Sequence, residues 1–160
     1  MAQAVGGLLE RQGCLLGLAE SCTGGLLAEL FTKHAGASNH FAGGVVCYTN
    51  QIKQSALGVP ETLLAAHGAV SQPVAEAMAR GACRALEVPI ALALTGIAGP
   101  AGGSQEKPVG LVHMAVCYDS SMIHQAQVFP GDRKQIQWRA AFTGLSMLRQ
   151  ALTGRMKASS

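Results

Sequence analysis

Aromatic side chains, charged side chains and long hydrophobic runs are all scarce in this 160-residue sequence. Aromatic residues make up only 4% of it, so the core must be built from the aliphatic side chains that dominate a hydrophobic fraction of 49%. Charged residues reach only 13%, which is low for a soluble monomer and predicts buried helix faces and a homo-oligomer. No apolar run approaches the roughly 20 residues of a membrane helix, and no signal-peptide pattern opens the chain. We therefore expect a cytoplasmic protein without a membrane partner.

Metal-binding and nucleotide-binding motifs are also missing from the sequence. No CxxC, HExxH, Walker A or GxGxxG pattern occurs, so no metal is predicted, and nucleotide binding through those motifs is unsupported. The five cysteines are odd in number and widely spaced, as expected of reduced thiols rather than a disulfide framework. The net charge of +3 comes without a basic run, which favours an anionic small molecule over nucleic acid as the partner.

Hydrophobic periodicity predicts an α/β fold. Helices and strands alternate at first, and a hairpin around 119–121 follows, which indicates a single three-layer α/β/α domain with a mixed, mostly parallel sheet. We expect this domain to span residues 1–156 and a disordered tail to span 157–160. The expected helices cover 2–12, 26–33, 51–57, 60–68, 73–86 and 132–152, and the expected strands cover 14–20, 41–50, 90–94, 109–118 and 122–129.

The most informative stretch is 15–25, LLGLAESCTGG, in which an apolar strand turns into a helical pattern. Such a turn holds a hydroxyl at the end of a rigid strand and aims backbone N–H groups and the positive helix end at the same point. Ser21 is then a candidate nucleophile beside an anion site. The alternative is that Ser21 or Thr23 only caps the helix, with the glycines serving the turn.

In three predicted strands the apolar residues are followed by a hydroxyl residue and then a loop; these hydroxyl residues are Ser21, Tyr48 and Thr95. If the strands are parallel, these hydroxyls share the carboxyl edge of the sheet, where open α/β folds bind ligands, although hydroxyl residues are also common turn formers. No histidine falls at this edge and no GxSxG elbow is present. A desolvated lysine is the alternative base, and Lys53 is the best placed. The SxxK string at 104–107 is disfavoured because Pro108 opposes helical geometry there.

The position of Arg133 in the sequence is electrostatically unfavourable. It follows Asp132, the first residue of a capping-box pattern, in the first turn of a predicted helix, where the dipole disfavours a cation. An anionic ligand would explain it, and so would a surface ion pair with Asp132.

Several ordered segments resemble the CinA C-terminal domain family, whose stand-alone members include the PncC-type nicotinamide-nucleotide amidohydrolases. The segments are AESCTGG at 19–25, GGVVCYTNQIK at 43–53, GVPETLLAAHGAVS at 58–71, TGIAGPAGG at 95–103, EKPVGLVH at 106–113 and FPGDR at 129–133. The resemblance implies hydrolysis of nicotinamide mononucleotide to nicotinic acid mononucleotide and ammonia.

The resemblance also implies roles for individual residues. Ser21 matches the nucleophile and Lys53 its general base, while Tyr48, Thr95 and Arg133 match further active-site positions, with Arg133 on the anionic part of the substrate. The remaining predicted substrate-binding residues are Cys22, Thr23, Gly24, Gly25, Asn50, Gly96 and Gly99. Neither a metal nor a cofactor is required by this chemistry. Two non-hydrolytic hypotheses stay open, a nucleotide-binding regulatory module that uses the same site and a scaffold that assembles through apolar surface.

Overall fold

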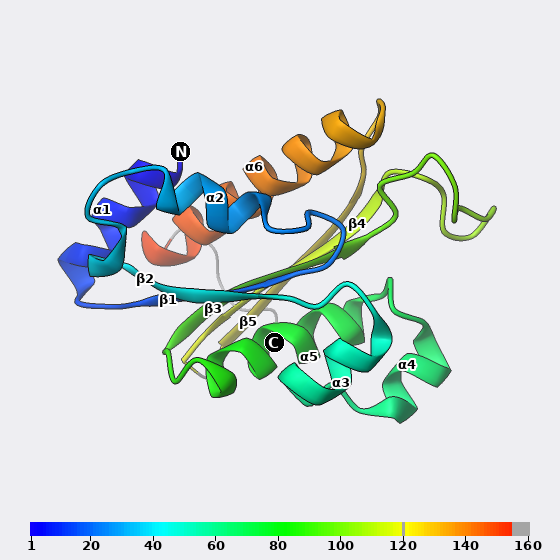
Figure 1. Cartoon of the computed structure of the whole chain (residues 1–160), viewed down its shortest axis with the longest axis horizontal. Helices are drawn as coiled ribbons and strands as arrows, with labels where there is room; N and C mark the ends of the chain where they lie inside the picture. The colour runs from blue at the N-terminus through cyan, green and yellow to red at the C-terminus, as the bar shows by residue number, and fades with distance from the viewer. Residues whose placement is uncertain (120, 155–160) are drawn as a thin grey trace.

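The computed structural model describes residues 1–119 and 121–154. A five-stranded sheet lies between two layers of helices, with α1, α2 and α6 on one face and α3, α4 and α5 on the other (Figure 1). The helices are α1 (Ala2–Gln12), α2 (Leu26–Thr32), α3 (Asn50–Leu57), α4 (Glu61–His67), α5 (Gln72–Ala85) and α6 (Arg133–Leu152), with a 3-10 turn, η1, at Ala37–Asn39. The strands are β1 (Leu16–Glu20), β2 (Phe41–Val46), β3 (Ile90–Gly96), β4 (Leu111–Tyr118) and β5 (Ser121–Val128).

The strand order β2-β1-β3-β4-β5 confirms the expected mixed sheet in a three-layer α/β/α domain. β1 pairs in parallel with β2 on one side and with β3 on the other. β4 runs antiparallel to β3, and β5 antiparallel to β4. The carboxyl ends of β1, β2 and β3 therefore lie at the same edge of the sheet.

Alternating side chains of the central strands build two separate cores. Leucines of β1 and β3, such as Leu18 and Leu92, face α1, α2 and α6. Alanines on the opposite face, such as Ala19 and Ala93, pack against α5. Every residue of β1 is buried, as expected for a strand that is covered on both faces. The small side chains on the second face let α5 approach the sheet closely.

β1 and β2 are shorter than predicted, because residues at one end of each take part in the neighbouring helix or its cap. The strand expected at 14–20 begins at Leu16, because the Cys14 N–H still bonds to Leu9 O at the end of α1. The strand expected at 41–50 ends at Val46, because Thr49 becomes the N-cap of α3. The predicted tail at 157–160, the end of the expected domain at 155–156 and the middle of the hairpin at 120 fall outside the described residues.

Candidate active site

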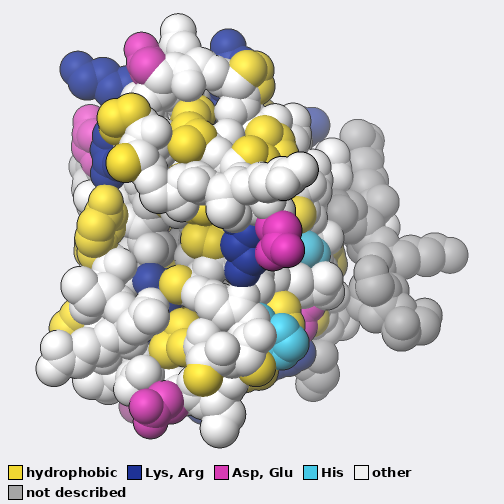
Figure 2. Space-filling model, turned by 90° about the vertical axis from the view of Figure 1, so that its right-hand side faces the viewer, with side chains coloured by type: hydrophobic (Ala, Val, Ile, Leu, Met, Phe, Trp, Pro, Cys, Tyr) yellow, Lys and Arg dark blue, Asp and Glu magenta, His cyan; other side chains and the backbone are white. Residues whose placement is uncertain are grey.

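A cavity of about 200 Å³ opens at the edge where the three parallel strands end. Figure 2 faces this side of the molecule, where the surface is hollowed and basic side chains lie within and beside the hollow. The three hydroxyl residues that end the predicted strands all line the cavity. Its lining residues are Ser21, Cys22, Tyr48, Lys53, Ala69, Val70, Thr95, Gly96, Ala98 and Arg133.

A serine and a lysine form the chemical centre of the cavity. Lys53 Nζ donates to Ser21 Oγ at 3.0 Å and to the Cys47 carbonyl at 2.8 Å. The lysine is 1% exposed, and burial lowers its pKa below the ordinary value of 10.5, since desolvation disfavours the ammonium. Within residues 1–119 and 121–154 no carboxylate forms an ion pair with it. Burial therefore makes the neutral amine, which is the form that can accept the serine proton, more accessible than it is in a free lysine.

The start of α3 explains how Lys53 reaches the end of β1. Thr49 caps the helix, since its Oγ1 accepts a hydrogen bond from Ile52 N at 3.4 Å. Lys53 lies one turn further along, and helical side chains point back toward the N-terminus. The amine of Lys53 therefore points back from α3 to Ser21, which directly follows β1.

A buried glutamate, Glu20, organises the turn that carries Ser21. Its carboxylate is 1% exposed and accepts three backbone N–H bonds at the start of α2, from Gly25 at 3.1 Å, Leu27 at 3.0 Å and Ala28 at 2.9 Å. Glu20 therefore occupies the positive end of α2, where the sequence suggested an anion site. The alternative that Ser21 or Thr23 caps this helix is wrong, because Gly25 is the N-cap and, among the described residues, neither hydroxyl accepts a hydrogen bond from a helix N–H.

The backbone of the turn leaves two N–H donors next to the candidate nucleophile, Ser21. Gly24 N donates to Ser21 O at 3.2 Å, and Gly25 N is committed to Glu20. The Cys22 and Thr23 N–H groups have no hydrogen-bond partner in the described part of the chain. On the opposite side, Gln137 Nε2 of α6 donates to Cys22 O at 2.8 Å. Two free N–H groups next to a serine are the arrangement that stabilises an oxyanion.

Cys22 lines the cavity but is not a thiolate. Burial is the main reason that its pKa is raised to about 12, and the Glu20 charge adds to the effect. A thiol with such a pKa stays protonated at neutral pH and is a poor nucleophile. The chemistry of the neighbouring pair therefore favours Ser21 over Cys22 as the attacking group.

Arg133 spans the rim of the cavity. Its guanidinium donates to Gly99 O at 2.9 Å and to the Tyr48 hydroxyl at 2.8 Å. The suggested ion pair with Asp132 does not form, because Asp132 is the N-cap of α6 and completes a capping box with Gln135. A guanidinium has five N–H donors, so the two bonds leave others for an anionic ligand. Tyr48 is 58% exposed, so this rim is open to solvent.

Thr95 lines the cavity with its hydroxyl already committed. Thr95 Oγ1 donates to Ala69 O at 2.8 Å and so holds the connection between α4 and α5 against the end of β3. The contact indicates that Thr95 positions the wall of the cavity. Gly96 also lines it, packed so closely against β4 that a Cβ would come within 2.6 Å of Leu111 O.

Five of the predicted site residues do not line the cavity: Thr23, Gly24, Gly25, Asn50 and Gly99. Gly24 and Gly25 shape the turn with φ values of 62° and 104°, and Gly99 contributes a carbonyl to Arg133. Thr23 is 4% exposed, and its Oγ1 has no partner among the described residues. Sequence reasoning missed the lining residues Ala69, Val70 and Ala98, which lie in quoted segments but carry no polar side chain. It also missed Gln137, and it assigned no role to Glu20, although an acid that ends a buried strand was a signal.

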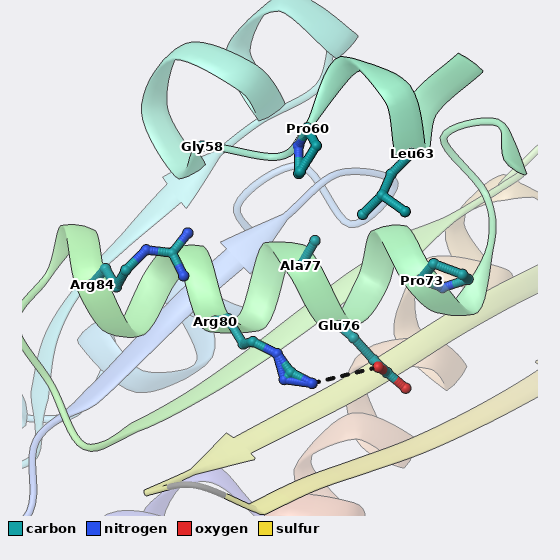
Figure 3. A pocket seen from close by; sticks show the side chains of 8 residues that line it. All are labelled: Gly58, Pro60, Leu63, Pro73, Glu76, Ala77, Arg80 and Arg84. Atoms are coloured by element: carbon teal, nitrogen blue, oxygen red, sulfur yellow. Dashed lines mark ion pairs between the residues drawn. The ribbon is translucent and has the colours of Figure 1, made fainter. Parts of the chain in front are cut away.

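A larger cavity of about 350 Å³ lies between α4 and α5, remote from this chemistry (Figure 3). Arg80 and Arg84 project along it from α5, and Arg80 pairs with Glu76 at 3.7 Å. Among the described residues, its lining offers no hydroxyl, thiol or lysine. The lining residues are Gly58, Pro60, Leu63, Pro73, Glu76, Ala77, Arg80 and Arg84.

Across residues 1–119 and 121–154, no group of three or more His, Cys, Asp or Glu side chains is arranged to hold a metal ion. A search of the same residues finds no helix that is both long and apolar enough to cross a membrane.

The family model and the related proteins found by comparison agree on one family. The family model of the CinA C-terminal domain matches residues 1–152. A CinA-like protein of Anaeromyxobacter sp. (strain Fw109-5) is 53% identical over 144 residues, which are 90% of this chain and 35% of that protein. A putative competence-damage inducible protein of Moorella thermoacetica is 43% identical over 152 residues, which are 95% of this chain and 37% of that protein. The chain thus spans about a third of the length of these curated relatives.

Solved structures show the same fold. The competence/damage inducible protein CihA from Agrobacterium tumefaciens is 41% identical, with a TM-score of 0.91 over 95% of this chain and 93% of that one. A CinA superfamily protein from Klebsiella pneumoniae is 31% identical, with a TM-score of 0.92 over 96% of each chain.

Proposed function

Because this chain belongs to the CinA C-terminal domain family, we propose that it is an amidohydrolase that converts nicotinamide mononucleotide to nicotinic acid mononucleotide and ammonia. One observation carries the proposal: the buried Lys53 amine contacts Ser21 Oγ at 3.0 Å. A neutral lysine beside a serine is a sufficient general base for acyl transfer. The resemblance of the sequence segments to nicotinamide-nucleotide amidohydrolases supplies the substrate.

The first step transfers a proton and forms a bond. Lys53 takes the Ser21 hydroxyl proton while Oγ attacks the carboxamide carbon, and the carbonyl oxygen becomes an oxyanion. The N–H groups of Cys22 and Thr23 directly follow the nucleophile in sequence and have no other partner in the described chain. Removing one such donor typically costs about 10²–10³ in kcat.

The second step expels ammonia. The Lys53 ammonium returns its proton to the amide nitrogen, the C–N bond breaks, and an ester remains on Ser21. Water, deprotonated by the same amine, then attacks the ester and releases the carboxylic acid with a free serine. One amine thus serves as base and acid in turn, so the mechanism requires its pKa to lie near the working pH.

The size and charge of the cavity support a nucleotide substrate whose amide end lies inside the cavity. A cavity of about 200 Å³ is smaller than the roughly 300–1,000 Å³ of pockets that enclose drug-sized ligands. It therefore accommodates the nicotinamide and leaves the ribose and phosphate at the open rim. Arg133 lies at that rim with donors to spare, which suits a phosphate.

The test is ammonia release from nicotinamide mononucleotide by the purified protein, with Ser21→Ala as the matched blank. Wild type is expected to release ammonia and nicotinic acid mononucleotide in equal amounts, and Ser21→Ala less than a few per cent of that. If wild type binds the nucleotide without releasing ammonia, the amidohydrolase proposal fails and the binding-module hypothesis replaces it. If Ser21→Ala keeps the wild-type rate, the assigned nucleophile is wrong.

A further inference from the structure

Gln137 contacts the nucleophile turn from a helix 115 residues further along the chain. Its Nε2 donates to Cys22 O at 2.8 Å, in a partly buried setting. The neighbours Ile136 and Ala140 are buried in the core, which fixes the rotation of α6 and therefore the direction of the glutamine.

The carbonyl that Gln137 holds belongs to the same peptide unit as a free donor. In a trans peptide the C=O of one residue and the N–H of the next are coplanar and point in opposite directions. The Cys22 carbonyl and the Thr23 N–H are such a pair. Fixing the oxygen therefore fixes the direction of the N–H, and a hydrogen bond to the oxygen also polarises the N–H into a stronger donor.

The opposite flank of the turn is held independently. Glu20 secures Gly25, Leu27 and Ala28, but it makes no bond to the Cys22–Thr23 peptide. Since the Thr23 N–H has no partner in the described chain, the peptide plane could rotate without losing a bond of its own N–H. Among the described residues, only the hydrogen bond from Gln137 to the Cys22 carbonyl opposes this rotation.

We propose that Gln137 is a positioning residue, which orients the Thr23 N–H as an oxyanion donor by holding the Cys22 carbonyl. This inference rests on the proposed amidohydrolase function and deepens it. Gln137 lies four residues after Arg133, so both project from the same side of α6. One helix would then align the substrate phosphate and the oxyanion donor together.

The inference predicts a loss in kcat without a comparable change in KM. Gln137→Glu keeps the shape of the side chain and removes the donor, and Gln137→Met removes all hydrogen bonding at similar volume. Each is expected to lower kcat about 10-fold to 100-fold, below the full cost of an absent oxyanion donor. KM should change less than about threefold, because the donor acts on charge that develops only in the transition state. Gln150→Met makes the same chemical change elsewhere on α6 and should leave both constants unaltered.

Three measurements on the full chain decide the inference: steady-state kinetics on nicotinamide mononucleotide, the melting temperature, and the rate at which a fluorophosphonate probe labels Ser21. Reduced kcat and slower labelling in both Gln137 variants, at a melting temperature within a few degrees of the Gln150→Met control, support it. Wild-type kcat and labelling in both variants overturn it while the amidohydrolase proposal stands. If wild type releases no ammonia, the amidohydrolase proposal fails, and the rates of Ser21 labelling alone decide the role of Gln137. Equal labelling rates in wild type and the Gln137 variants, or no labelling of wild type, then overturn that role as well.

Discussion

Replacing Lys53 tests the proposed Ser21–Lys53 mechanism most directly. Lys53→Met nearly preserves the volume of the buried side chain and removes the amine that contacts Ser21 Oγ at 3.0 Å. Loss of a general base typically costs about 10²–10⁴ in rate. Because the methionine needs no desolvation of a charge, we expect the variant to stay folded, with a melting temperature close to that of wild type. Ammonia release from nicotinamide mononucleotide measures the rate.

A second substitution separates proton transfer from electrostatics. Lys53→Arg keeps a positive charge and hydrogen-bond donors, but a guanidinium with a pKa above about 12 cannot act as a base. If Lys53 works by accepting the serine proton, Lys53→Arg is as inactive as Lys53→Met. Lys33 is an exposed lysine at the end of α2. Lys33→Met is therefore the control for the loss of a lysine and should keep the wild-type rate.

The pH dependence of wild-type activity tests the direction in which the pKa of Lys53 is shifted. Burial lowers the pKa of Lys53 below 10.5, so the reactive neutral amine accumulates as pH rises through that lowered pKa. Activity should therefore increase with pH, tenfold per unit on the acid side, and reach half of its maximum below pH 10.5. Retention of more than about a tenth of the wild-type rate by Lys53→Met, or a half-maximal rate that is reached only above pH 10.5, would refute the base assignment.

Three further substitutions test other parts of the structure. Cys22→Ala should keep most turnover, because the thiol with a pKa of about 12 is not ionised; a loss comparable to Ser21→Ala in the ammonia assay would contradict this. Arg133→Gln should raise KM about 10-fold to 100-fold with a smaller effect on kcat, as expected for one charge-assisted hydrogen bond, and should weaken the salt dependence of KM; an unchanged KM would remove Arg133 from substrate binding. Gly81→Ala should destabilise the fold by about 1–3 kcal/mol in thermal unfolding, because a Cβ would collide with Leu57 O. Gly7→Ala, which meets only an Arg11 side-chain atom at 3.5 Å, is the control and should not destabilise.

The sequence by itself determined the fold class and the position of the reactive groups. Alternating apolar strands and amphipathic helices can be packed only in layers, so the periodicity predicted the α/β/α arrangement. Parallel strands end at a common edge, so Ser21, Tyr48 and Thr95 could be placed together from their positions at strand ends. The choice of Lys53 followed from its place one turn beyond the second strand and from the lack of a histidine at that edge.

Tertiary structure decided how those groups are bonded. Thr95 turned out to hold the Ala69 carbonyl, Arg133 to bond with Tyr48 rather than Asp132, and Glu20 to occupy the end of α2 where an anion had been expected. Local sequence sets backbone conformation through steric and hydrogen-bonding preferences that act over a few residues. The partner of a polar side chain depends instead on which distant surface packing brings within about 3 Å, as Gln137 and Cys22 illustrate across 115 residues, and that distance is fixed only when the whole core has assembled.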